Sequence, residues 1–159
     1  MTYTTTLATT LQLFDLVVLN QDFPIDHLRR GEIGTVVEVF DQNSDRPAYE
    51  VEFIDDEGQP LALVTLTLDQ LLPLTPTQYH RIQRIIQDLK ALYAELDHTY
   101  PGNPTMVGIK TLERIETNPS LKQRITKAGK EAGLAAIEAA LDHPAVTITM
   151  AGIKGFVEG

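Results

Sequence analysis

The sequence predicts an α+β protein: a small five-stranded antiparallel barrel of the SH3-like kind, followed by a unit of three or four helices. Apolar residues alternate with polar ones up to about residue 75 and recur at steps of three and four beyond it, which are the periods of strands and helices. The charge changes at the same place. Residues 1–75 carry 13 acidic against 3 basic residues, and residues 76–159 carry 9 acidic against 10 basic ones. We therefore expect an acidic barrel at residues 11–74 and a nearly neutral helical domain at residues 76–159.

Five short apolar segments predict the strands of the barrel: residues 16–19, 33–40, 49–54, 61–68 and 71–74. The second and third segments place apolar and acidic side chains on opposite faces, as half-buried antiparallel strands do. The fourth is apolar enough to be buried on both faces or to cross the barrel. Polar loops at residues 41–47 and 55–60 predict two hairpins. Five strands at this spacing are typical of a small closed or half-open barrel.

Three helix starts in the second half share a capping residue followed by a proline: Thr75-Pro76, Asn103-Pro104 and Asn118-Pro119. The first predicted helix ends at Tyr100-Pro101-Gly102, and the third extends to Leu141. A last segment at residues 145–157 is expected to be helical, although residues 146–149 are equally compatible with an extended strand because they are largely β-branched.

The helical half offers candidate interaction residues. An apolar stripe on the first helix repeats at steps of four, three, four and three: Ile82, Ile86, Leu89, Tyr93 and Leu96. Gly129 and Gly133 lie on a face of small residues that allows close helix approach, and we favour packing within the chain over the alternatives of a homodimer or a partner helix. Arg124 and Lys127 belong to a cluster at residues 110–130 with a net charge of +4. This cluster is either a solvated helix face or a docking site for an acidic partner.

The barrel half carries motifs that resemble known domains. The segment Arg29-Arg30-Gly31-Glu32-Ile33-Gly34 and the strand after it resemble the glycine-containing strand entry of KOW-type barrels, some of which contact RNA. Because this half is strongly acidic, we favour glycines that serve barrel geometry over contact with nucleic acid.

Together with residues 13–19, 49–58 and 66–71, residues 28–38 resemble a bacterial family of small barrels that has no known function and is frequent in cyanobacteria. The resemblance implies a fold and no catalytic residues. Similar proteins are often suspected to be antitoxin-like members of two-gene pairs.

Residues 85–157 resemble a helical tail of cyanobacterial signalling and pentapeptide-repeat proteins. The similar motifs are Tyr100-Pro101-Gly102-Asn103, residues 113–124 and Leu141-Asp142-His143-Pro144-Ala145. This resemblance implies an adaptor module that makes protein–protein contacts.

The sequence contains no recognisable catalytic, cofactor-binding or metal-binding motif. It has no cysteine, and its histidines are scattered without metal-ligand spacing: His27, His80, His98 and His143. The pairs Asp97-His98 and Asp142-His143 stand at predicted helix ends, where a histidine usually meets the terminal carbonyl groups. We therefore expect no enzyme activity and no cofactor.

Composition narrows the expected partners. A net charge of −9 argues against nucleic-acid binding, and no apolar run is long enough for a membrane span. The first ten residues lack the features of a secretory signal, so we expect a cytoplasmic protein. The predicted function is a non-enzymatic protein–protein interaction or adaptor protein with a protein partner of unknown identity. The alternative is an antitoxin or immunity-type protein whose acidic barrel neutralises a basic partner.

Overall fold

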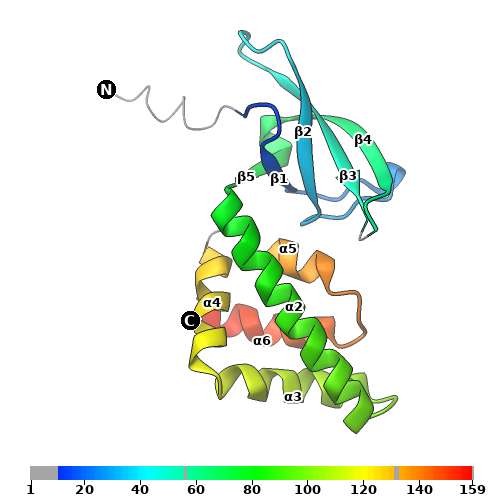
Figure 1. Cartoon of the computed structure of the whole chain (residues 1–159), viewed down its shortest axis with the longest axis vertical. Helices are drawn as coiled ribbons and strands as arrows, with labels where there is room; N and C mark the ends of the chain where they lie inside the picture. Colours follow the sequence, from blue (N-terminus) through cyan, green and yellow to red (C-terminus); the bar gives the residue numbers. More distant parts are fainter. Residues whose placement is uncertain (1–10, 56, 131–132, 159) are drawn as a thin grey trace. The chain divides into compact units, whose positions relative to one another are not determined.

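The chain divides into two compact units, Met1–Pro76 and Thr77–Gly159 (Figure 1). The computed structural model describes residues 11–55, 57–130 and 133–158. The first unit contains a five-stranded antiparallel sheet and the second contains five α-helices, so the predicted α+β class is confirmed. No helix in the described part of the chain is both long enough and apolar enough to cross a bilayer.

The five strands of the sheet are β1 (Leu16–Leu19), β2 (Ile33–Phe40), β3 (Ala48–Ile54), β4 (Pro60–Thr67) and β5 (Leu71–Leu74). Their bounds agree with the predicted segments to within one residue. The strands lie in the order β4-β3-β2-β1-β5, and each neighbouring pair is antiparallel. Within the described residues no ladder joins β4 to β5. The sheet is therefore open, and closure into the predicted SH3-like barrel is not confirmed.

The inner face of the sheet carries the core of the first unit. Alternate residues of β3, namely Tyr49, Val51 and Phe53, are almost completely buried there. The other buried members of this cluster are Leu11, Val17, Leu19, Leu28, Val36, Leu66 and Leu71. The Tyr49 hydroxyl is buried without a hydrogen-bond partner among the described residues. With no partner in the described part of the unit, a buried hydroxyl of this kind lowers stability.

Two glycines give β2 its place in the sheet. Gly31 has a φ of 96°, a left-handed value that glycine adopts without strain just before the strand begins. Gly34 lies over β3, where an added Cβ would stand 2.5 Å from Val51 Cγ1 and 2.8 Å from Phe53 Cε1. Gly31 thus serves backbone conformation and Gly34 close packing in this chain.

Strand β4 is not buried on both faces, which was one of the two arrangements expected for it. Leu66 is buried and Ala62 and Val64 are half-buried on the inner face, whereas Leu61 and Leu63 are exposed on the other face. The strand lies at the edge of the sheet, and among the described residues of the first unit nothing covers Leu61 and Leu63 on its outer face. The apolar composition of this segment therefore led to a prediction of more burial than the side chains of β4 have.

The helices of the second unit are α2 (Pro76–Thr99), α3 (Pro104–Glu116), α4 (Pro119–Lys130), α5 (Gly133–Ala140) and α6 (Val146–Glu158). The prediction of three or four helices is wrong by one, because the segment predicted as a single third helix contains both α4 and α5. The final segment is helical, which decides between the helix and the extended strand. Asn103 and Asn118 accept hydrogen bonds from the amides of Met106 and Leu121, respectively, as the N-cap pattern predicts.

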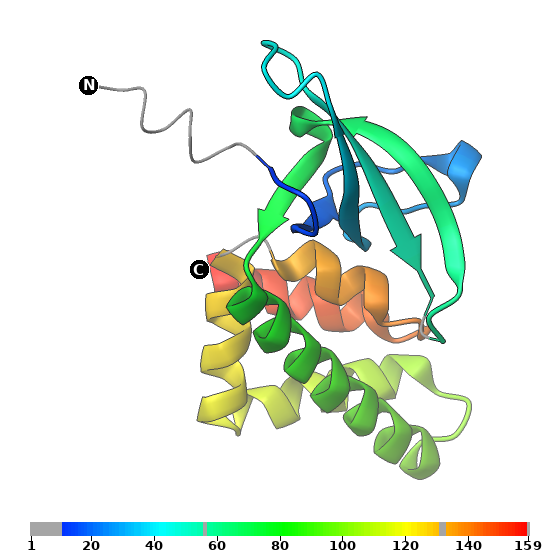
Figure 2. The same ribbon diagram turned by 45° about the horizontal axis from the view of Figure 1, so that its top comes forward.

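Helix α2 is the longest helix and crosses α3 and α6 (Figures 1 and 2). Its apolar stripe is buried, with each of the five predicted side chains at most 4% exposed: Ile82, Ile86, Leu89, Tyr93 and Leu96. Tyr93 also donates a hydrogen bond to Thr149 Oγ1 of α6 over 2.7 Å, and Thr149 donates to the Ala145 carbonyl. The stripe therefore forms part of the core of the chain.

Candidate functional site

The outer edge of the sheet exposes apolar side chains. Leu61 and Leu63 of β4 are 53% and 58% exposed, and Ile54 at the end of β3 is 53% exposed. The register places Leu63 opposite Glu52 and Ile54 opposite Pro60, and an irregularity after Phe53 leaves Leu61 between them without a direct partner, so the three exposed residues lie close together near the end of the β3–β4 hairpin. Exposed apolar groups on an edge strand are unusual in proteins that stay unbound, because such edges pair with other chains.

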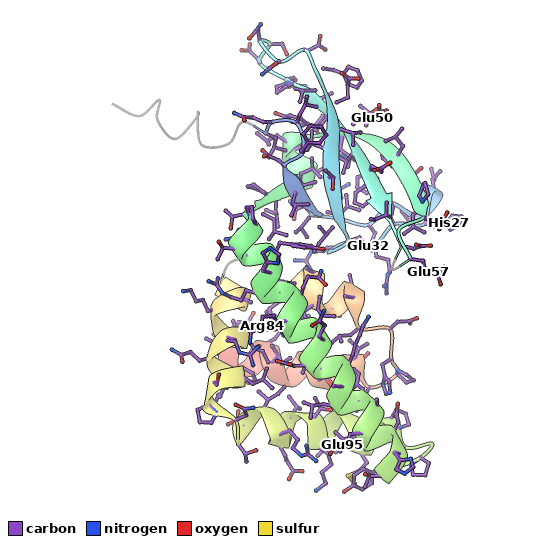
Figure 3. All side chains as sticks on the ribbon, in the orientation of Figure 1. His27, Glu32, Glu50, Glu57, Arg84 and Glu95 are labelled. Carbon is purple, nitrogen blue, oxygen red and sulfur yellow. The ribbon has the colours of Figure 1, made fainter. Side chains whose placement is uncertain are left out.

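A row of carboxylates runs beside this apolar strip on the same face. Glu38 of β2 lies opposite Glu50 of β3, and Glu52 lies two residues further along β3. A bulge between Val36 and Glu38 shifts the register and brings the two glutamates into opposition. Figure 3 shows Glu50 on the sheet. Like charges in direct cross-strand contact destabilise a sheet, so the local sequence is not optimised for stability at this place.

We use the name outer face for the solvent-facing residues of this region, which are Glu38, Glu50, Glu52, Leu61, Leu63 and Thr65. The other edge of the sheet is different. Strand β5 has only four residues and contains Pro73, whose missing N–H blocks part of any new ladder. Strand β4 has eight residues and no charged side chain. Among the described strands, β4 is therefore the edge best suited to pairing with another chain.

The helical unit has an open groove of about 850 Å³ where α2 faces the corner between α3 and α4. Its lining residues are Asp88, Ala91, Leu92, Glu95, Arg114, Thr117, Asn118, Pro119, Leu121 and Arg124. Two ion pairs span it, Arg114 to Glu95 over 2.9 Å and Arg124 to Asp88 over 3.0 Å. Glu95 lies near the C-terminal end of α2 (Figure 3). Because these charges already have partners, the groove suits a shallow protein contact better than tight capture of a small ion.

His143 lies in the connection between α5 and α6 and binds α2. Its Nδ1 accepts a hydrogen bond from the Ala145 amide over 2.9 Å, so the proton of the neutral ring is on Nε2, which donates to Asp97 over 2.8 Å. The ring stacks on Tyr93, with the centroids 4.4 Å apart. With both nitrogens occupied, this histidine has no nitrogen left for acid–base chemistry. The expected contact with terminal carbonyl groups is wrong for His143, which pairs instead with a carboxylate 46 residues away.

The sheet unit is similar to one known domain family. Residues 13–73 match the family model described as Domain of unknown function (DUF4926). The match begins just before β1 and ends within β5, so it covers all but the last residue of the sheet and includes the outer face. No curated protein and no solved structure shows significant similarity to the chain. The predicted resemblance to a family of small domains with no known function is therefore confirmed for residues 13–73.

Both predicted glycine positions lie where the helices pack within the second unit. An added Cβ at Gly129 would stand 2.9 Å from Val157 of α6, and one at Gly133 would stand 2.6 Å from the Ala128 carbonyl oxygen. A larger side chain at Gly133 would therefore clash within the second unit. A homodimer through this face stays a prediction.

The basic cluster at residues 110–130 is partly neutralised by ion pairs, and two of the carboxylates, Asp88 and Glu95 of α2, lie outside the segment whose charge was counted. Arg114 and Arg124 pair with α2, and Lys122 pairs with Glu116 over 2.9 Å. The Glu113 carboxylate accepts a hydrogen bond from Lys110 and raises the pKa of its ammonium group. Lys127 is exposed. These ion pairs favour the interpretation as a solvated helix surface, and docking of an acidic partner stays a prediction.

The sequence reasoning missed the outer face as a candidate site. The signal was present, since residues 60–68 are apolar and adjoin an acidic hairpin. Interpreting that signal requires knowing that β4 is an edge strand. In the hairpin loop after β3, Asp55 Oδ1 accepts hydrogen bonds from the Glu57 and Gln59 amides and so organises the β3–β4 turn.

Proposed function

We propose that this chain is a non-enzymatic interaction or adaptor protein with two small modules, and that the sheet unit contacts a protein partner through its outer face. The observation that carries the proposal is the edge strand β4, which exposes Leu61 and Leu63 and pairs only with β3 among the described strands. An exposed apolar edge of this length is a template for association. The proposal includes a cytoplasmic location and an SH3-like character of the sheet unit.

The helical unit supplies the second surface in this proposal. The groove between α2 and the α3–α4 corner is open, and it presents Leu92 between two ion pairs. Such a mixture of apolar floor and charged rim is common in protein–protein contacts. Resemblance of residues 85–157 to cyanobacterial helical tails supports an adaptor role for this unit.

A comparison of two tagged forms in extracts of the encoding organism tests the proposal. The wild-type chain and the double variant Leu61→Ser, Leu63→Ser are used as bait, and co-purified proteins are quantified by mass spectrometry. Both leucines are exposed, so the variant should fold normally. We expect at least one protein to be enriched tenfold or more by the wild type and lost with the variant. Equal recovery by both forms would contradict a role for the outer face.

The alternative function is an antitoxin or immunity-type protein, in which the acidic sheet unit neutralises a basic partner. The row Glu38, Glu50 and Glu52 supports such a role because it places carboxylates next to an apolar strip. The two functions differ in the consequence of binding. An antitoxin abolishes the activity or toxicity of its partner, and an adaptor leaves that activity intact, so expressing the partner alone and together with this chain distinguishes them.

A further inference from the structure

We propose that β4 binds an extended segment of a partner by strand addition, and that this segment alternates basic and apolar residues. The inference rests on the proposed interaction function and adds to it the mode of binding and the chemistry of the partner.

Strand addition first requires a strand whose backbone is paired on one side only, and β4 is such a strand among the described residues. Its ladder with β3 runs from Pro60 to Thr67, and the opposite side of the strand makes no hydrogen bond with the backbone of any other segment that the structure describes. The eight residues Pro-Leu-Ala-Leu-Val-Thr-Leu-Thr carry no charge that would repel an approaching strand. Main-chain hydrogen bonds to such an edge supply affinity, and alternate side chains supply specificity.

The outer face determines which side chains the partner segment presents on one side of its strand. Leu63 borders the edge, and Glu52 lies directly behind it on β3. Thr65 and Glu50 form the next such pair. Because neighbouring strands are about 4.8 Å apart, an added strand would lie about 10 Å from β3. A lysine or arginine on it can lay its methylene groups on Leu61 and Leu63 and bring its charge close to the glutamates.

The inner side of β4 determines which side chains the partner segment presents on the opposite side of its strand. Ala62 and Val64 are only half-buried although they adjoin the core of the sheet unit. Residues of an added strand that point to this side would cover them and complete the core, so these positions favour small or β-branched apolar side chains. The two sides together require a segment that alternates basic and apolar residues.

Charge argues for a different molecule as the occupant over a second copy of this chain. Residues 1–75 carry 13 acidic and 3 basic residues, so pairing two β4 strands would bring two strongly acidic units together. It would also place both rows of Glu50 and Glu52 on one continuous face. A basic segment makes the same backbone hydrogen bonds and reduces the repulsion between Glu38 and Glu50.

The test uses the full chain and three synthetic eight-residue peptides. The probe alternates valine and lysine, and the charge control alternates valine and glutamate. The pattern control has the composition of the probe, with four valines followed by four lysines. Amide hydrogen exchange locates binding, and fluorescence anisotropy measures affinity at 50 mM and 500 mM NaCl. Glu50→Gln, Glu52→Gln is the test variant. Asp45→Asn in the β2–β3 loop is the control for removing a charge elsewhere on the sheet unit, since Asp45 is exposed and lies outside the outer face.

We expect the valine–lysine peptide to protect β4 amides and to bind at least tenfold more tightly than either control peptide. The affinity should fall at least tenfold at high salt and at least fivefold in the glutamine variant, and should fall less than twofold in Asp45→Asn. Equal binding of the glutamate peptide, or binding that leaves the β4 amides unprotected, would overturn the inference. So would a twofold mass in light scattering together with β4 protection without peptide, because a second copy would then occupy the edge. If the bait experiment succeeds and the peptide fails, the partner chemistry is wrong while the interaction function stands.

Discussion

Glu38 of β2 and Glu50 of β3 are direct cross-strand partners on the outer face of the sheet. Two carboxylates in this relation repel each other, and the bulge after Val36 creates the relation. Places where a sequence departs from local stability rules are often functional sites. In this chain the repulsion lies between β2 and β3, one strand in from the unpaired edge of β4, and a basic partner at that edge would reduce it.

Glu38→Gln is expected to stabilise the sheet unit. Removing one charge of the pair should raise the free energy of unfolding by about 0.2–1 kcal/mol, and 1 M NaCl should reduce the gain because salt screens exposed charges. Urea titration followed by NMR signals of the sheet measures the effect. Asp45→Asn is the control, because it also removes one negative charge from the sheet unit but at a loop position that has no cross-strand partner. An equal gain in stability in that variant would show that the net charge of the unit, and not the Glu38–Glu50 pair, is responsible.

Tyr49→Phe is also expected to stabilise the sheet unit. The tyrosine ring is fully buried and its hydroxyl has no hydrogen-bond partner among the described residues. Phenylalanine keeps the ring and removes the unsatisfied group, so the free energy of unfolding should rise by about 1 kcal/mol. The same urea titration measures it. A loss of stability would mean that the hydroxyl makes a favourable interaction.

The same substitution should have opposite effects at two glycines. Gly34→Ala places a Cβ against Val51, Phe53 and the Glu52 carbonyl, and overpacking of this kind should cost about 1–3 kcal/mol. Gly155→Ala in α6 meets no atom within 4 Å and should stabilise the helical unit by up to about 1 kcal/mol. NMR-detected urea unfolding of each unit compares the two. A neutral Gly34→Ala would contradict the close approach of β2 and β3.

The helical unit should lose stability in alkaline solution through Tyr93. Burial raises the pKa of its hydroxyl, and the hydrogen bond with Thr149 opposes that shift only in part. The stabilisation is complete below the pKa of a tyrosine in the unfolded chain, about 10, and is lost as the pH rises through the higher pKa of the folded state. Far-ultraviolet circular dichroism between pH 8 and 12 measures the loss. In Tyr93→Phe, we expect about 1 kcal/mol lower stability at pH 8 and a weaker dependence on pH above 10. An unchanged alkaline dependence in that variant would contradict the assignment to Tyr93.

The local parts of the fold could be predicted from the sequence. The change of hydrophobic period near Thr75 marks the passage from strands to helices, and the caps Asn103 and Asn118 mark helix starts, because each signal involves residues a few positions apart. The division of the predicted third helix into α4 and α5 was missed. That segment is rich in alanine, which gives a continuous helical pattern without a break.

The candidate site could not be predicted, since it depends on long-range arrangement. Which strand lies at the edge determines whether Leu61 and Leu63 are core or surface, and composition does not contain that information. The opposition of Glu38 and Glu50 requires the register and the bulge. Likewise, His143 and Asp97 meet only because α2 packs beside the α5–α6 connection.

The most direct test of the interaction function is site-specific photo-crosslinking in living cells of the encoding organism. A photoreactive phenylalanine analogue replaces Leu63 on the outer face or, as a control, Asp45 in the β2–β3 loop, and both positions are exposed. We predict one dominant adduct with another protein at position 63, with the attachment point in an extended segment rich in Lys or Arg, and little adduct at position 45. Equal crosslinking at both positions, or an adduct at position 63 only with a second copy of this chain, would contradict the account.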